Sequence, residues 1–155
     1  MSTQAVALNK TTYCALCAAL QMARSPHGRV TAGEVARLYG WPEAAVAKVF
    51  QQLVRARLAN GARGVGGGHS LARPASRITV LDVIAALEPG RAARTGIASP
   101  GPSRGAPDRP LRRLLGEVDE LVRCTFESVT LETLVGRRQW DAAVAGSVVR
   151  PQREV

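Results

Sequence analysis

The chain has 155 residues, of which 46% are apolar, so it can fold around a core and is not a disordered chain. It carries 21 Lys and Arg against 12 Asp and Glu, and the formal charge of +9 indicates an acidic partner. The three cysteines are too few to form a disulfide framework, and no run approaches the ~18 apolar residues of a membrane span. The first residues lack the features of a signal peptide, so we expect a cytoplasmic protein with no membrane partner.

The charge is unevenly distributed. Residues 1–88 carry ten basic and four acidic residues (+6), residues 89–110 carry four and one (+3), and residues 111–155 carry seven of each (zero). Only Lys10 and Lys48 are lysines, and every other basic residue is an arginine. The arginine guanidinium can form bidentate hydrogen bonds to phosphates and guanine edges. The distribution predicts an N-terminal unit that meets a polyanion, nucleic acid being the first candidate, and a C-terminal unit with another role.

Three helices are expected in the first third of the chain. The apolar spacing predicts one over 10–24, with an inward stripe of Tyr13, Leu16, Cys17, Leu20 and Ala23. A capping box formed by Thr31 and Glu34 opens the second, with inward residues Val35, Leu38 and Tyr39. Gly40 ends it in the left-handed conformation.

The third helix is expected over roughly 42–57, with a stripe of Val46, Val49, Phe50 and Leu53. Two helices joined by a tight glycine turn are typical of a helix-turn-helix, although a plain helical hairpin gives a similar pattern.

A glycine- and arginine-bearing loop at 61–69 lies between strand candidates at 58–59 and 70–73, which predicts a β-wing. Its glycines would let the backbone approach a phosphate or groove, and its arginine could enter the minor groove. A merely flexible hairpin is the alternative. A nucleotide-binding loop is rejected, because His69 stands where a dinucleotide fingerprint needs glycine and no Gly-Lys-Ser/Thr follows.

The rest of the chain predicts a capped helix over 78–87 with Val83, Ile84 and Leu87 inward, and then a long loop at 89–110. A long amphipathic helix follows over roughly 108–128. Its apolar stripe comprises Leu111, Leu114, Leu115, Val118, Leu121, Val122 and Phe126. A second copy of the chain could cover this stripe in a two-fold dimer, and packing back onto the N-terminal domain is the alternative. A short capped helix is expected over 129–135.

Three segments together resemble the Rrf2 family of bacterial winged-helix regulators, the IscR, NsrR and CymR type. RGVGGGHSLARP at 63–74 is similar to the family's wing, which reads Arg-Gly-x-x-Gly-Gly-Tyr-x-Leu. ITVLDVIAALE at 78–88 resembles the helix that follows, and VTLETLV at 129–135 resembles the closing motif. The resemblance covers roughly residues 8–137. It implies a homodimer that places a recognition helix in the major groove and a wing arginine in the minor groove of a palindromic operator, usually as a repressor.

The sequence departs from this family in its loop. Many members hold an iron–sulfur cluster on three cysteines before the dimer helix, but residues 89–110 contain neither cysteine nor histidine. We therefore expect no cluster and no other cofactor. The recognition helix begins with Glu43, Ala44 and Ala45, so base readout by this helix is expected to be modest. His69 replaces the family's wing aromatic residue, and a packing or phosphate-facing role is expected for it.

The sequence predicts a mainly α fold with a small β-wing, in which a winged helix-turn-helix domain is followed by a long C-terminal dimerisation helix. The expected parts are a DNA-binding domain at 1–88, a flexible loop at 89–110, a dimerisation helix and closing helix at 111–137, and a disordered tail at 138–155. The residues expected to bind double-stranded DNA are Lys48, Gln51, Gln52, Arg63, Gly66, Gly67, His69 and Arg73. Those expected at the dimer interface are Leu111, Leu114, Leu115, Val118, Leu121 and Val122.

The cysteines allow more than one interpretation. Cys14 and Cys17 are three apart on the first helix, where they could be small core residues, a thiol switch or, least favoured, metal ligands. No second Cys or His pair is spaced to complete a zinc site. Cys124 lies beside the apolar stripe of the long helix, where it could form an intersubunit disulfide.

No catalytic constellation is present, so the protein is not expected to be an enzyme. The main hypothesis is a sequence-specific DNA-binding transcriptional regulator, and a repressor is expected because most members of the resembled family are repressors. The alternative is a winged-helix protein-interaction module, or a thiol-based redox sensor with weak DNA readout.

Overall fold

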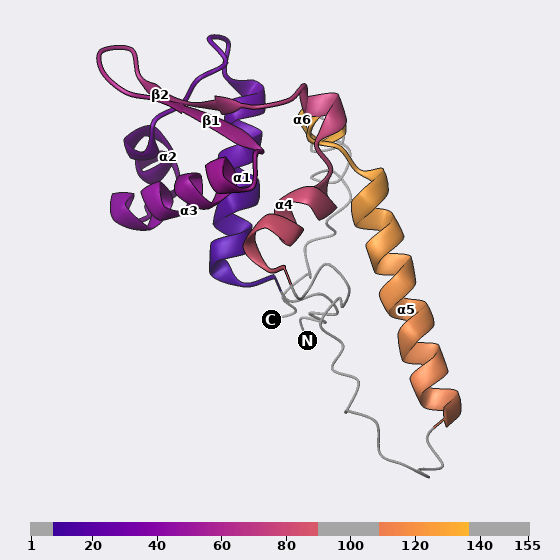
Figure 1. Ribbon diagram of the computed structural model, residues 1–155. Coiled ribbons are helices and arrows are strands. Elements are labelled where there is room, and N and C mark those ends of the chain that lie inside the picture. Colours follow the sequence, from indigo (N-terminus) through magenta and orange to yellow (C-terminus); the bar gives the residue numbers. More distant parts are fainter. Residues whose placement is uncertain (1–7, 90–108, 137–155) are drawn as a thin grey trace, which may run out of the picture.

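A computed structural model of the chain describes residues 8–89 and 109–136 (Figure 1). The expected tail at 138–155 and all of the expected loop at 89–110 except its first and last residues lie outside the described residues, and residues 109 and 110 belong to α5. The elements in chain order are α1 (Lys10–Arg24), α2 (Ala32–Tyr39), α3 (Glu43–Arg55), β1 (Ala59–Ala62), β2 (Gly68–Leu71), the 3-10 turn η1 (Ala75–Arg77), α4 (Val80–Leu87), α5 (Arg109–Ser128) and α6 (Leu131–Gly136). This mainly helical architecture with one small antiparallel sheet confirms the predicted winged helix-turn-helix.

Local sequence signals set the helix boundaries. The Thr31 hydroxyl accepts from the amide of Glu34 at 3.2 Å, and the Glu34 carboxylate accepts from the amide of Thr31 at 2.6 Å, so the predicted capping box is present. Gly40 follows α2 at φ 67°, the left-handed value that glycine adopts without strain. This turn directs the chain through Trp41 and Pro42 into α3, which completes the helix-turn-helix.

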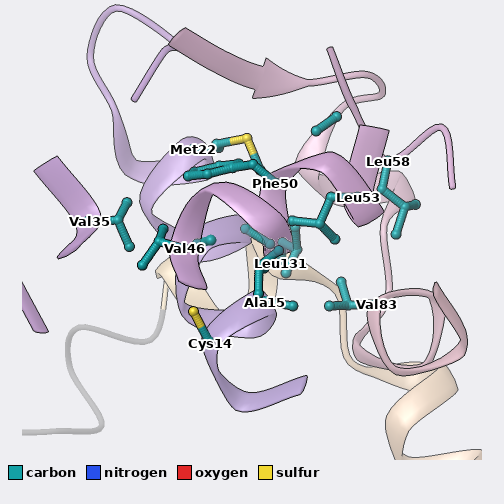
Figure 2. Close-up of a cluster of buried hydrophobic side chains, with 14 of the residues drawn as sticks. Cys14, Ala15, Met22, Val35, Val46, Phe50, Leu53, Leu58, Val83 and Leu131 are labelled. Carbon is teal, nitrogen blue, oxygen red and sulfur yellow. The ribbon is translucent and has the colours of Figure 1, made fainter. Parts of the chain in front are cut away.

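The core is built around α1 and α3, with α4 and α6 closing one side. Figure 2 shows side chains from these helices meeting around Phe50 and Leu53, both fully buried. Leu131 of α6 is also fully buried, and its amide donates to the carbonyl of Ile78 at 2.9 Å. An isolated β-bridge between Thr79 and Thr130 lies beside this bond. The closing motif is therefore anchored to the segment that leads into α4.

Two inward assignments from the sequence are wrong. Tyr13 is 55% exposed and Leu38 is 63% exposed. Most of the buried face of α1 consists of small residues. It comprises Thr12, Cys14, Ala15, Cys17, Ala18, Ala19 and Met22. Small side chains let α1 approach several neighbouring elements closely, which displaces the larger Leu stripe to the margin of the core. In α2, Val35 and Ala36 are buried, and Leu38 lies about 200° around the helix from Ala36.

The wing is a hairpin in which β1 and β2 pair antiparallel, with Ala59 opposite Leu71 and Ala62 opposite Gly68. The strands extend further toward the loop than the sequence predicts. The segment before α2 adds an isolated bridge, because Val30 and His69 exchange two backbone hydrogen bonds of 2.9 and 2.7 Å. The wing is thus fastened to the start of the helix-turn-helix.

Helix α5 differs from the other helices because none of its 20 residues is buried. It leads away from the helical body, at the opposite end of the molecule from the wing loop (Figure 1). Within the described ranges, no helix has the length and apolar character needed to cross a membrane.

Candidate nucleic-acid interface

The recognition helix presents a polar face opposite its buried one. Val46, Val49, Phe50 and Leu53 are buried along one side of α3. At 100° per residue, Lys48, Gln51 and Arg55 lie on the opposite side, and all three are exposed. Two positive charges and one amide therefore project together from the second helix of the turn. The sequence prediction included Lys48 and Gln51 but missed Arg55, which the four-residue spacing from Gln51 could have revealed.

Gln52 lies on the flank of α3 and not at the centre of this face. Its side chain is only partly exposed, and its Oε1 atom is buried without a hydrogen-bond partner among the described residues. The structure therefore separates Gln52 from Gln51, although the two are adjacent in the sequence.

At two glycines of the wing, neighbouring backbone atoms leave no room for a side chain. A Cβ atom on Gly67 would lie 2.6 Å from the carbonyl oxygen of Ala62 and 2.8 Å from that of Gly64. Gly68 has φ 136°, and a Cβ atom there would lie 2.9 Å from the carbonyl oxygen of Val30. The protein's own backbone occupies the space that a side chain would need, so these glycines are required for the wing to close.

The loop carries Arg63, which is exposed, and a second arginine reaches it from outside the wing. Arg29 donates from its Nη1 atom to the carbonyl of Gly66 at 3.3 Å. Arg57, two residues after the end of α3, has a left-handed φ of 58° and is also exposed. The sequence prediction missed Arg29 and Arg57. Arg29 could not be found from local pattern, because its hydrogen bond spans 37 residues.

Two of the predicted wing residues lie away from the loop. Arg73 follows β2 at the base of the wing, where its Nη2 atom is 3.9 Å from the Asp82 carboxylate. His69 stacks on Phe50 of α3, with ring centroids 4.2 Å apart and planes inclined by 12°. Burial lowers the pKa of His69, which favours the neutral ring. His69 therefore joins the wing to the core beneath it.

The apolar stripe of α5 is only partly covered. Leu111, Leu114 and Leu121 are 56%, 55% and 69% exposed. The predicted interface residues Leu115, Val118 and Val122 are half-buried. The described part of the chain therefore leaves three leucines of the stripe exposed and covers the other residues in part.

The three cysteines occupy two kinds of environment. Cys14 and Cys17 are buried in α1, and burial raises the pKa of both thiols, so they are poor nucleophiles. Cys124 is exposed on α5, and its thiol lies 3.5 Å from Glu120, which raises its pKa. By the helical spacing it lies about 60° around the helix from Leu121, at the edge of the apolar stripe.

A metal-binding group is not found in the described part of the chain, which contains no cluster of three or more His, Cys, Asp or Glu side chains arranged to hold an ion. The two buried thiols and the exposed one do not supply the set of thiolates that an iron–sulfur cluster needs. The described residues therefore do not fit such a group.

Comparison with known proteins gives consistent results. Residues 8–137 match the sequence model of the Rrf2 family, described as iron-dependent transcriptional regulators. BadM of Rhodopseudomonas palustris, named as an HTH-type transcriptional regulator, is 37% identical over 128 residues, which cover 83% of this chain and 80% of BadM.

Solved structures show the same fold. CymR, the global cysteine regulator of B. subtilis, superposes with a TM-score of 0.72 at 21% identity, over 85% of this chain and 98% of CymR. IscR of T. potens superposes with a TM-score of 0.68 at 20% identity, over 96% of each chain. At these identities the structural likeness supports the winged-helix fold alone.

Proposed function

Because this chain belongs to the Rrf2 family of transcriptional regulators, we propose that it binds double-stranded DNA as a homodimer at a palindromic operator and represses transcription. The observation that carries this proposal is the polar face of α3, where Lys48, Gln51 and Arg55 project together away from the core. Such a face is suited to the major groove, which admits an α-helix.

The charge of the winged-helix part supports a polyanionic partner. Residues 8–89 contain ten basic and four acidic residues, a net charge of +6, whereas residues 109–136 contain four and five, a net charge of −1. Two of the four acids are used locally, because the Glu34 and Asp82 carboxylates cap their own helices. The exposed side chains of Lys48, Arg55 and Arg63 can therefore contact phosphates, which supply most sequence-independent affinity.

Arg63 and the wing extend this surface toward a second groove. The wing loop carries Arg63 at an exposed position, and Arg29 adds a second guanidinium to the loop through the Gly66 carbonyl. Arginine is favoured where the minor groove is narrow and its potential most negative. In this proposal α3 lies in the major groove and the wing contacts the adjacent minor groove.

The exposed stripe of α5 supports the homodimer. A 20-residue helix with no buried residue and with three leucines more than half exposed leaves an apolar surface facing water. A second copy would cover both stripes by a two-fold arrangement, since the same surface would be buried on each chain. Dimerisation would also place two winged-helix units on one duplex.

Operator binding is tested by selecting bound duplexes from a random pool and sequencing them. The proposal predicts an inverted repeat whose half-site centres are separated by about one helical turn, roughly 34–36 Å, or a multiple of it. Recovery of unrelated sequences, or of single half-sites bound by one chain, would contradict it. Repression is checked by in vitro transcription from a promoter that carries the selected repeat, where added protein should lower transcript yield.

The dimer is tested by light scattering on a Leu114→Asp and Leu121→Asp double variant. Two carboxylates on the exposed stripe should give a monomer, because burying them unpaired is costly. Arg113→Ala is the matched control, since its side chain is 84% exposed on the charged face of the same helix and pairs with Glu117 at 3.1 Å. A dimer that survives the double variant would refute this interface.

We also propose that the protein works without an iron–sulfur cluster or other cofactor. The cysteines available as cluster ligands support this proposal. The chain has three cysteines, and two of them are buried in α1 with raised pKa values. Protein purified without oxygen should be colourless, with no absorption band at wavelengths longer than those of its aromatic side chains. A brown preparation that loses its colour on oxidation would contradict the proposal.

A further inference from the structure

A groove of about 760 Å³ lies between the first turns of α1 and the first half of α3, beside the polar face assigned to DNA, with which it shares Lys48. Its volume is in the range of sites for small organic molecules. Tyr13 and Cys14 line it from α1, Val49 and Gln52 line it from α3, and Trp41 lines it from the turn. The proposed function does not use this groove.

The groove offers an aromatic wall. Tyr13 and Trp41 meet edge to face, with centroids 6.3 Å apart and planes inclined by 77°. Trp41 also stacks on Tyr39, with ring centroids 4.6 Å apart. Tyr13 is 55% exposed although it is apolar over most of its surface. A flat or elongated apolar body placed here would bury this ring surface.

The polar groups of the groove favour an anion. Lys10 lines it from α1 and Lys48 lines it from α3, and these are the two lysines of the chain. The described residues that line the groove include no Asp or Glu. Gln52 also lines the groove, and the nitrogen of its amide is a hydrogen-bond donor. An organic carboxylate matches two ammonium groups beside an apolar wall.

We propose that this groove binds a small apolar carboxylate, with its hydrocarbon body against Tyr13 and Trp41 and its carboxylate between Lys10 and Lys48. Lys48 also belongs to the polar face of α3, so a bound carboxylate competes with DNA phosphate for the same ammonium group. The ligand site stands on its own geometry, whereas this competition rests on the proposed function.

Isothermal titration calorimetry without DNA tests the ligand site. The probes are 2-naphthoate and decanoate, which carry one head group on different bodies, and the neutral 2-naphthalenemethanol. At least one carboxylate should bind with a Kd below about 1 mM, given the affinity usual per ligand atom. The neutral alcohol should bind more weakly, and the two carboxylates together show which body the aromatic wall prefers. Absence of heat from both carboxylates, or equal binding of the alcohol, would overturn the proposal.

Three variants locate the site. Lys10→Gln should weaken carboxylate binding about two- to fivefold, as expected for loss of an exposed ion pair. Ala45→Trp should abolish it by filling the groove, since Ala45 lines the groove and is exposed. Arg77→Gln, an exposed charge outside the groove, should leave it unchanged. Binding that survives Ala45→Trp with the fold intact would place the ligand elsewhere and refute the inference.

The competition is then measured by adding the tighter carboxylate to the protein–DNA complex. Wild type should lose DNA affinity as the carboxylate saturates. The DNA affinity of Ala45→Trp, measured first without carboxylate, should stay at that value when carboxylate is added. Carboxylate binding with no duplex bound at all would refute the proposed function and leave the groove site standing. DNA affinity that is unchanged at saturating carboxylate would refute the competition.

Discussion

Replacing Gly67 by alanine tests the reasoning about the wing most sharply. The added Cβ atom would lie 2.6 Å from the Ala62 carbonyl oxygen, 2.8 Å from that of Gly64 and 3.2 Å from the carbonyl carbon of Arg63. All three are backbone atoms, so no side-chain rotation can relieve the crowding. Gly67 is not among the glycines with positive φ, so the effect isolates crowding from backbone conformation.

The expected loss of stability in Gly67→Ala is best compared with the effect of Gly61→Ala in the same hairpin. Overpacking of this kind costs about 1–3 kcal/mol. At Gly61 of β1 an added Cβ atom meets only the His69 ring, at the ordinary distance of 3.6 Å. Alanine there should stabilise by about 0.5–1 kcal/mol, because glycine is unfavourable inside a strand. The two variants should therefore differ by roughly 1.5–4 kcal/mol in their free energy of unfolding.

Urea unfolding followed by circular dichroism measures this difference, and thermal melting gives a second value. About 2–4 °C per kcal/mol is expected for a chain of 155 residues, so Gly67→Ala should melt below Gly61→Ala. Amide spectra of the wing residues show whether the loop opens locally, in which case DNA affinity falls more than global stability. Equal melting temperatures and equal wing spectra for the two variants would refute the account of wing closure.

Two further predictions concern titratable side chains. Burial lowers the pKa of His69 in the folded protein, so the unfolded chain binds more protons and stability should fall as the pH drops below about 6.5. His69→Phe should keep the stack on Phe50 and flatten the dependence of stability on pH between about 7.5 and 5.5, and a slope that persists would show that another group causes it. Cys124 should react with a thiol reagent in the folded protein while Cys14 and Cys17 react only on unfolding, because the last two are buried. Rapid modification of all three thiols would contradict this burial.

Local signals determine much of the fold. The capping boxes at Thr31 and Thr79 and the left-handed turn at Gly40 depend on residues within three or four positions, so the sequence contains all the information they need. The buried face of α1 is harder to predict, because alanine gives little hydrophobic contrast between an inner and an outer face. The apolar spacing consequently places Tyr13 inward, although it is exposed.

The candidate site is predictable to the extent that it is local. Helical spacing places Lys48 and Gln51 on one face, and the same spacing could have added Arg55. The hydrogen bond of Arg29 to the wing and the stack of His69 on Phe50 join residues far apart in the chain, so only the folded arrangement reveals them. The groove between α1 and α3 is a tertiary feature of the same kind, because Lys10 and Lys48 become neighbours of one cavity only on folding.

The central claim is that α3 and the wing bind DNA, and the salt dependence of binding tests it most directly. Fluorescence anisotropy with the selected duplex gives the affinity of wild type, Arg63→Ala and the control Arg113→Ala across a series of salt concentrations. Arg63→Ala should weaken binding and lower the slope of log affinity against log salt by about one unit for each phosphate that the variant no longer neutralises, with Arg113→Ala unchanged. Wild-type protein that binds no duplex at low salt, or an Arg63→Ala variant that matches wild type in affinity and slope, would contradict the claim.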